Sequence, residues 1–358
     1  MRGANVARLA AVPAALAVGL GALAIAQGPG RFTTYAGRSD IDTALTVAAG
    51  LALVAAGLVT SFSRRTARIG DLAMLAGLIW FAPVWVGWDN GLPLVRTLGM
   101  LVAGFTFPLL LHLVVAYPSG RLHGVVARTL VAVVYLEAAL AAIGRALFRD
   151  PFFDPNCWAN CTDNVFLLGS LPPLARGIET ADRWFTMAAA AALVMLCVRR
   201  LLRNSGPARR ALLPVALPAI LLAAAVIAHA IALQRRPLED PPDPAFHMIF
   251  VVGCVAVILL GAGLVWAAVR AWVQRRAVAR IATSLGQAPP PGSLHAALAH
   301  AVGDPALQIA YWLPDSEHYV DANGRPVAEP VAGPGRAVTA LVRDGRRIAV
   351  VSHTAALP

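Results

Sequence analysis

Residues 303–327, GDPALQIAYWLPDSEHYVDANGRPV, and residues 335–353, GRAVTALVRDGRRIAVVSH, decide how this chain is organised. Leu307–Leu313 is a short run of apolar and aromatic residues, as is typical of a β-strand. Asp321–Gly324 consists largely of turn-forming residues. The first segment therefore predicts a strand followed by a turn back toward it.

The second segment predicts a hairpin. Ala337–Val342 and Arg347–Val351 flank Asp344-Gly345, a dipeptide typical of tight hairpin turns. Upstream, Ser293–Val302 has helical spacing and begins with a residue that favours helix N-caps. Residues 293–358 are thus expected to form a small α/β module with one helix and about four short strands.

The rest of the chain has the composition of a membrane protein. Of the 358 residues, 58% are hydrophobic, and the mean hydropathy is +0.67. All 30 basic residues are arginine. A retinal Schiff base and a Walker A phosphate loop both require a lysine, so the sequence excludes these two kinds of site.

Apolar runs of roughly 20 residues, long enough to span a bilayer, recur about eight times. The predicted spans lie near residues 6–26, 41–62, 69–88, 94–117, 125–147, 184–202, 211–233 and 247–272. Ala24-Ile25-Ala26 also matches a signal-peptidase site, in which case the first run would be removed. The predicted fold class is an α-helical multi-pass membrane protein with a small cytoplasmic α/β module.

Arginine placement predicts the orientation. With a cytoplasmic N-terminus, the inner segments hold sixteen arginines and the outer segments nine, together with most of the acidic residues. Cytoplasmic loops are enriched in basic residues. We therefore expect a cell-membrane protein with both termini in the cytoplasm. The basic net charge of +11 then reflects membrane topology, and no nucleic-acid partner is expected.

The longest outer loop is predicted at Arg149–Asp182, and it contains Cys157 and Cys161. A disulfide between them is expected because the outer compartment is oxidising. A metal or redox site is the alternative, although the further ligands of a zinc site are missing.

Few ionisable residues fall inside the predicted spans. Glu137 is the clearest case, with His112 and His229 behind it. A carboxylate inside the membrane indicates function by default, and hydrogen bonding within the bundle is the alternative. Pro83, Pro108, Pro214 and Pro218 can break helices, as in transporters, but no paired pattern or internal repeat accompanies them.

The segment after the last span is where a signal would pass to the module. It contains Trp272, Arg275, Arg276 and Arg280, which also suit a simple anchor at anionic lipid headgroups. The predicted domains are residues 1–275 in the membrane, 276–292 as a juxtamembrane helix and Pro-rich linker, and 293–358 as the module.

The tail motif GDPxLxxAYWLPDxxxYVDxxGRPV, followed by the hairpin around Arg343-Asp344-Gly345, resembles the GAF-like domain of actinobacterial sensor histidine kinases that partner NarL/LuxR-type regulators. Tyr117–Leu122, YPSGRL, resembles a turn found between two spans of the same kinases. Asp154-Pro155, the paired cysteines and Asn164 resemble their outer loop, with wider cysteine spacing here. The resemblance implies a polytopic sensor region, a GAF-like domain and then a kinase core.

The catalytic motifs of that kinase core are absent from the sequence. There is no His-Asp-x-x-Gln phosphoacceptor box, and His353 is followed by Thr354 where the family often has aspartate. The Asn-bearing ATP box and the Asp-x-Gly-x-Gly segment are missing as well. We expect no enzymatic activity, and a GAF-like part that is truncated. The chain would be a fragment, a degenerate product or a sensor that acts through a partner chain.

The sequence thus predicts the sensory input module of a two-component histidine kinase, which relays a stimulus through the last span. The alternative is a small-molecule transporter with a regulatory tail. The expected partners are the lipid bilayer, a second copy or a partner kinase chain, and an unidentified small-molecule or membrane stimulus. No cofactor is expected.

The arginine distribution makes the topology testable. Reporter fusions at Ser170 and at the C-terminus should place Ser170 outside the cell and the C-terminus in the cytoplasm. A cytoplasmic Ser170 would overturn the assignment.

Overall fold

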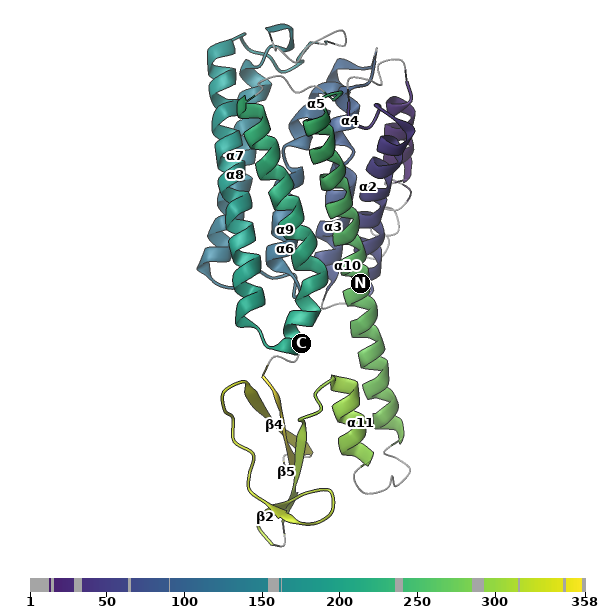
Figure 1. Cartoon of the computed structure of the whole chain (residues 1–358), viewed down its shortest axis with the longest axis vertical. Helices are drawn as coiled ribbons and strands as arrows, with labels where there is room; N and C mark the ends of the chain where they lie inside the picture. Colours follow the sequence, from purple (N-terminus) through teal and green to yellow (C-terminus); the bar gives the residue numbers. More distant parts are fainter. Residues whose placement is uncertain are drawn as a thin grey trace. The chain divides into compact units, whose positions relative to one another are not determined.

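The computed structural model describes residues 13, 16–28, 34–63, 66–89, 91–153, 161, 163–235, 241–284, 293–314, 316–343 and 346–355. The chain separates into two compact units. One unit comprises Met1–Arg199 and Pro214–Val265 and is helical, and the other comprises Arg200–Leu213 and Trp266–Pro358 and contains a β-sheet (Figure 1).

Among the described residues, seven helical spans are long and apolar enough to cross a membrane. They are built from the helices α2 (Asp40–Ser61), α3 (Ala67–Ile79), α4 (Ala82–Val86), α5 (Pro93–Ala103), α6 (Thr106–Ala116), α7 (Val125–Phe148), α8 (Pro172–Arg203), α9 (Gly206–Arg235) and α10 (Pro244–Ser284). These helices confirm the second to eighth predicted spans. A shorter apolar helix, Leu16–Ala26, lies in the first predicted span, and most of residues 6–15 lie outside the described residues.

Helices α7 and α8 expose large apolar side chains to their surroundings. Leu136 and Leu140 on α7 are each 60% exposed, and Met195 on α8 is 67% exposed. A water-soluble protein rarely presents such a surface, whereas lipid tails cover it without penalty. This face of the helical unit is therefore a lipid-contacting face, as expected for a multi-pass membrane protein.

Helices α2 and α3 pack through glycines that stand seven residues apart on each helix. A Cβ atom added to Gly57 on α2 would lie 2.8 Å from the carbonyl oxygen of Gly70 on α3. A Cβ added to Gly77 would lie 2.8 Å from the carbonyl oxygen of Gly50. Since lipid supplies no hydrophobic force between helices, this backbone approach supplies the packing energy instead.

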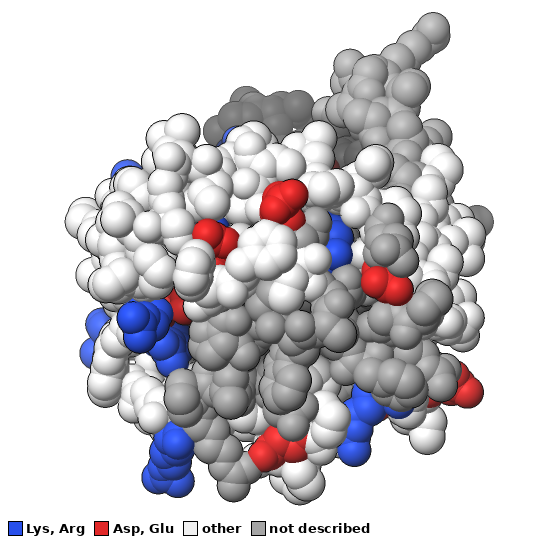
Figure 2. All heavy atoms as spheres, turned by 90° about the horizontal axis from the view of Figure 1, so that it is seen from above, with Lys and Arg blue, Asp and Glu red and all other residues white. Residues whose placement is uncertain are grey.

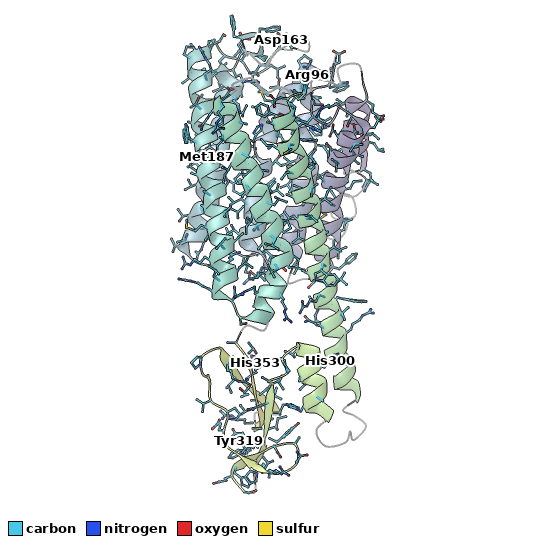
Figure 3. The ribbon with its side chains drawn as sticks, in the orientation of Figure 1. Arg96, Asp163, Met187, His300, Tyr319 and His353 are labelled. Carbon is cyan, nitrogen blue, oxygen red and sulfur yellow. The ribbon has the colours of Figure 1, made fainter. Side chains whose placement is uncertain are left out.

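Two of the four prolines singled out in the sequence interrupt their helices. Pro83 cannot donate to the carbonyl of Ile79, where α3 ends, and Pro108 cannot donate to that of Gly104, beside which α5 ends. Buried Arg96 helps to hold one broken region, because its Nε donates to the Val86 carbonyl at 3.0 Å (Figure 3).

The other two prolines stay inside α9. Pro218 lacks the N–H that would bond the carbonyl of Pro214 within the helix. That carbonyl faces Gly263 of α10, so closely that a Cβ at Gly263 would clash with its oxygen. The proline and the glycine together let α9 and α10 approach at this point.

The predicted outer loop at Arg149–Asp182 is wrong in its second half. After α7 come a short 3-10 turn, η2 (Pro151–Phe153), and then α8, which begins at Pro172 rather than near residue 184. Proline is favoured in the first turn of a helix. The first turns of α8 are polar, so an apolar run marks only the part of the helix that lipid covers.

The second unit contains a five-stranded antiparallel sheet with strand order β3-β2-β1-β5-β4. Its elements are α11 (Ser293–Val302), β1 (Gln308–Leu313), β2 (His318–Val320), β3 (Pro326–Val327), β4 (Arg336–Arg343) and β5 (Arg346–Thr354). These confirm the predicted helix and strands, and β3 adds a strand to the four expected. Asp344 and Gly345, the predicted hairpin turn, lie outside the described residues.

Asp304 fastens the end of α11 to the end of β5. Its carboxylate accepts hydrogen bonds from the backbone N–H and the hydroxyl of Thr354, at 2.7 and 2.9 Å, and from the N–H of Ala306 at 3.0 Å. Burial acts to raise the pKa of Asp304, but these hydrogen bonds outweigh it and hold that pKa below its ordinary value.

Each face of the sheet carries its own small core. Leu307, Ile309 and Ala349 pack against Leu298 and Val302 of α11. On the other face, Tyr319 packs edge-on against Trp312, with ring centroids 4.9 Å apart (Figure 3). The identity of this sheet as a GAF-like domain stays a prediction.

The close approach of α9 and α10 predicts a position-specific effect of adding one methyl group. Replacing Gly263 by alanine should destabilise the protein by about 1–3 kcal/mol, because the methyl group meets the Pro214 carbonyl. Gly253→Ala in the same helix meets no atom within 4 Å and should be neutral or stabilising by up to about 1 kcal/mol. Thermal unfolding of the two variants in nanodiscs compares them, and equal melting temperatures would contradict the packing.

Candidate functional site

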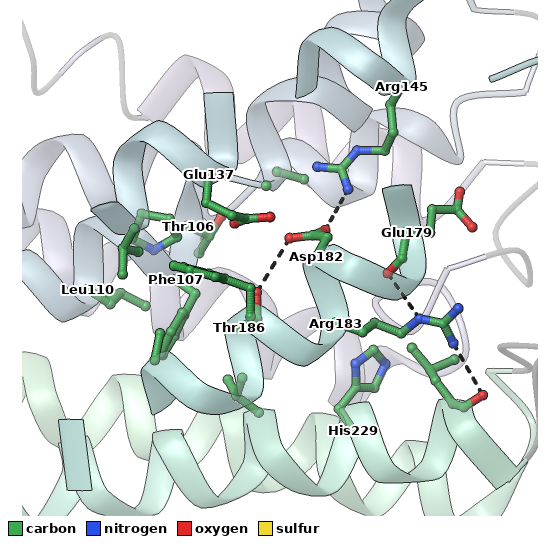
Figure 4. Close-up of a pocket in the computed structure, with 18 of the residues that line it drawn as sticks. Thr106, Phe107, Leu110, Glu137, Arg145, Glu179, Asp182, Arg183, Thr186 and His229 are labelled. Atoms are coloured by element: carbon green, nitrogen blue, oxygen red, sulfur yellow. Dashed lines mark hydrogen bonds and ion pairs between the residues drawn. The ribbon is translucent and has the colours of Figure 1, made fainter. Parts of the chain in front are cut away.

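The helical unit contains a partly open cavity of about 520 Å³ between α5, α6, α7, α8 and α9 (Figure 4). Cavities of this volume accommodate small ligands. Its lining combines apolar side chains with three arginines, Arg145, Arg149 and Arg183, and three carboxyl groups, Glu137, Glu179 and Asp182. These groups make it the candidate functional site.

The central charged group of the cavity is Asp182 on α8. One of its carboxylate oxygens accepts from Nη1 of Arg145 on α7 at 2.6 Å, and the other accepts from the Thr186 hydroxyl at 3.5 Å. The carboxyl group of Glu137 on α7 is directed toward Asp182 (Figure 4). Two carboxylates can only accept hydrogen bonds, so a direct bond between these two groups would require a proton on one of them.

Gly104, between α5 and α6, makes room for Arg145. A Cβ atom at this position would lie 2.9 Å from Nη2 of Arg145. The break between α5 and α6, at which Gly104 stands, therefore leaves space for the guanidinium of the ion pair.

A second set of charges lies one turn nearer the start of α8. Nε of Arg149 lies 3.2 Å from Oε1 of Glu179. Arg183 donates instead to uncharged oxygens: the Glu179 carbonyl at 3.2 Å, the Leu233 carbonyl at 3.4 Å and the Thr180 hydroxyl at 3.4 Å. Figure 4 shows Arg183 extended across the cavity beside His229.

Thr106, the first residue of α6, contributes a polar atom to the cavity wall. Its hydroxyl oxygen is buried and has no hydrogen-bond partner within the described part of the chain. Buried hydroxyl groups are normally satisfied by protein, water or ligand. Thr106 therefore marks a place where the cavity can accept a hydrogen-bonding group from a guest molecule.

The structure brings together two of the three intramembrane residues predicted from the sequence. Glu137 and His229 both line the cavity. His112 belongs to a separate contact, in which its Nδ1 lies 3.3 Å from the Tyr135 hydroxyl. Figure 4 shows Glu137 directed toward Asp182.

Only one of the two cysteines of the predicted disulfide lies within the described residues. Cys161 is disulfide-bonded, whereas Cys157 lies outside the described residues, so the pairing stays a prediction. Cys197 and Cys254 are buried within the helices and are not disulfide-bonded.

The predicted relay residues all lie in the last part of α10. The guanidinium carbon of Arg276 stands 3.5 Å from the centre of the Trp272 ring, a cation–π contact. Arg275 is exposed, and the side chain of Arg280 lies outside the described set. Their role in a relay stays a prediction.

Sequence reasoning missed the partners of Glu137. In the sequence, the charged residues around it were assigned to an outer loop or its borders: Arg145, Arg149, Glu179, Asp182 and Arg183. A signal was nevertheless present in their spacing. Residues three or four apart share one face of a helix, which is the spacing of Glu179, Asp182 and Thr186, and also of Arg145 and Arg149.

A further polar contact that the sequence did not predict joins α2 to α10. Nε2 of His247 lies 2.8 Å from Oδ1 of Asp42, whose side chain is only 4% exposed. His247 also stacks on Phe250, which stacks on Tyr35. This contact ties the first turns of α10 to the helical unit.

Charge on the face seen in Figure 2 is mixed. Acidic and basic side chains stand interspersed among uncharged residues there, and the described residues on that face form no patch of a single sign.

In the whole described part of the chain, no three His, Cys, Asp or Glu side chains gather as metal ligands. We therefore interpret the charged residues of the cavity as ion pairs and not as a metal site.

Comparison with protein-family models gives no match for this chain, and none of the curated proteins compared with it is detectably similar in sequence. The class of the protein therefore follows from its structure: a membrane-embedded helical module with a polar cavity, joined to a small antiparallel sheet.

The carboxyl pair predicts a difference between two isosteric substitutions. Asp182→Asn leaves Arg145, whose side chain is 12% exposed, without its counter-charge. It should lower the free energy of unfolding by about 1–3 kcal/mol, a value between those of exposed and of buried ion pairs. Glu137→Gln should be nearly neutral, because an amide at this place can donate to the Asp182 carboxylate. Thermal unfolding in nanodiscs at neutral pH provides the measurement. A larger loss for Glu137→Gln than for Asp182→Asn would contradict the assignment of Asp182 as the central charged group.

Proposed function

We propose that this chain is the sensory input module of a signalling protein, which detects a small molecule in the cavity and passes the change inward through α10. The observation that carries the proposal is that one helix, α9, serves both parts. Leu222, Val226 and His229 of α9 line the cavity, while Pro214 of the same helix contacts Gly263 of α10.

Helix α10 has the length that a relay requires. It runs without interruption for 41 residues, Pro244–Ser284, and belongs to both compact units. At 1.5 Å per residue it is about 60 Å long, roughly twice the hydrocarbon thickness of a bilayer. A displacement of its membrane half is therefore carried beyond the membrane by an unbroken hydrogen-bonded rod.

The contacts of α10 with its neighbours are of the kind that switch between discrete states. Gly261 approaches the backbone of Ala52, Gly263 approaches that of Pro214, and His247 pairs with Asp42. Tightly packed interfaces repack in steps and do not deform continuously. A change in the position of α9 at the cavity therefore has a direct route to α10.

The signalling partner in this proposal is a histidine kinase core, in the same or another chain, acting on a dimer. The support for that partner is the resemblance of the tail motif and of Tyr117–Leu122 to such kinases. The chain itself contributes detection and relay, and no catalytic step.

Transport of a small molecule is the second candidate. It is favoured by the proline-broken helices α3/α4 and α5/α6 and by ionisable groups within the bundle, both common around transporter sites. Uptake of a cavity ligand by proteoliposomes containing the protein distinguishes it from a sensor.

The relay is tested by joining the full chain, through its C-terminus, to the dimerising helix and core of a reporter kinase. Asp182→Asn should change reporter output by about fivefold or more, a coupling typical of allosteric sites. Arg176→Gln, an exposed arginine on the same helix, should leave output unchanged. A pair of glycines inserted after Ala271 should abolish the effect of Asp182→Asn, because it breaks the rigidity of α10.

Immunoblots confirm equal amounts of each chimera in the membrane. A relay through α10 would be contradicted if Asp182→Asn left reporter output unchanged. It would also be contradicted if the substitution changed output equally with and without the inserted glycines.

A further inference from the structure

We infer that the cavity binds a small amphipathic organic anion, a carboxylate on an apolar body, with the carboxylate held by Arg183. This inference rests on the proposed function, since it names the class of molecule that the sensor detects. It is argued from the charges, the free hydrogen-bond donors and the graded polarity of the cavity.

The first argument is the balance of charge. Arg145 is paired with Asp182, and Arg149 with Glu179. Arg183 is the one arginine of the described lining for which no ion pair with a described carboxylate is found. A partly buried guanidinium without a counter-charge favours a monoanionic guest.

The second argument is the bonding of Arg183. A guanidinium carries five N–H donors. Within the described residues, Arg183 makes three hydrogen bonds, all to uncharged oxygens, and pairs with no carboxylate. Among the described residues, no acceptor is found for two of its N–H groups and no counter-charge for the guanidinium, so a carboxylate in the cavity can take a charge-assisted hydrogen bond from it.

The third argument is that polarity falls along the cavity. Along α8 the lining residues pass from Asp182 and Arg183 to Thr186 and then to Ala189. Along α9 they pass from His229 to Val226 and then to Leu222. A guest held at Arg183 therefore places its remaining atoms among apolar side chains.

The side chains at the apolar end of the cavity indicate which kind of hydrocarbon group it accommodates. Phe107 and Leu110 of α6 and Phe185 of α8 line this part of the cavity. Figure 4 shows Phe107 and Leu110 on the side of the cavity away from Arg183. Aromatic and branched aliphatic side chains favour a ring or a short hydrocarbon chain, and a cavity of about 520 Å³ holds either.

A cation is disfavoured at the same site. Each carboxylate that it would approach is already paired with an arginine, Asp182 with Arg145 and Glu179 with Arg149. A cationic guest would have to displace one of these arginines and leave its charge unpaired in the bundle.

The test uses the full chain in nanodiscs of zwitterionic phosphatidylcholine and three probes of one shape: phenylacetate, phenylacetamide and phenethylamine. Isothermal titration should show that phenylacetate binds at least about tenfold more tightly than the neutral amide, as removal of a charge-assisted hydrogen bond requires, and that the amine does not bind. Arg183→Gln should reduce phenylacetate affinity to that of the amide. Arg176→Gln is the matched control on the same helix and should leave the affinity unchanged.

The probe series on the unmodified chain keeps the inference testable even if Arg183→Gln does not fold. Equal binding of the acid and the amide, or tighter binding of the amine, overturns the inference, and so does a folded Arg183→Gln variant that keeps full affinity. Decanoate is a fourth probe. Tighter binding of decanoate supports the carboxylate and identifies a membrane-derived fatty acid as its source, whereas tighter binding of phenylacetate supports a water-soluble acid.

The outcome is separable from that of the proposed function. If the cavity variants change reporter output while no acid binds, the sensor stands and the ligand class is wrong. If phenylacetate binds through Arg183 but reporter output does not respond to it or to the variants, the ligand class stands and the sensor is wrong.

Discussion

The constraint behind this structure is that lipid hydrocarbon offers no hydrogen bonds. Every backbone N–H and C=O in the membrane must find a partner within the protein, which is why the apolar part of the chain is helical. The same solvent gives apolar side chains no reason to leave it. Helices therefore associate where backbones approach closely, as Gly57 and Gly70 allow between α2 and α3. The carbonyl of Pro214, released by Pro218, serves the same purpose against Gly263.

The charged residues of the cavity obey the same constraint in another way. Arg145 and Asp182 pair across α7 and α8, and Gly104 leaves the space that the guanidinium occupies. Such a pair is stable only while both members are present, because an unpaired charge is expensive in a low-dielectric medium. Under the proposed function, a guest that offers Arg183 a charged partner alters the balance of charge in the cavity. Helix α9 lines this cavity and contacts α10, and in the same proposal it passes that change on.

The parts of the structure that follow from one-dimensional rules could be predicted from the sequence. Bilayer thickness fixes the length of an apolar run, so α2 and α7 lie within about a residue of their predicted spans. The start of α8 at Pro172 could not be predicted from hydropathy, because hydropathy reports lipid contact and the first turns of α8 are polar. Likewise β3 has only two residues, too few for any periodicity.

Of the charged and polar cavity residues, Glu137 and His229 were predictable from the sequence, because each is an ionisable residue among apolar neighbours. Glu137 is conspicuous because its neighbours in sequence are apolar. Its partners were not, since Arg145 and Asp182 lie at the borders of apolar runs, where charges are ordinary. His112 was a candidate on the same ground, and its side chain lies against Tyr135 and is not among the described cavity residues. Which helix faces which is a three-dimensional fact that no single run of sequence contains.

The bond between Asp304 and Thr354 has a consequence for how the molecule is made. It spans 50 residues, and β5 is an inner strand of the sheet, paired with both β1 and β4. While the chain emerges from the ribosome, β1 and β2 are therefore exposed without their neighbour until Thr354 has been synthesised. The glycine contacts of α2 and α3, in contrast, join residues close in sequence and can form as soon as both helices are in the membrane. The membrane part can thus assemble during translation, whereas the sheet has to wait for its last strand and depends on nothing else binding its open edge in the meantime.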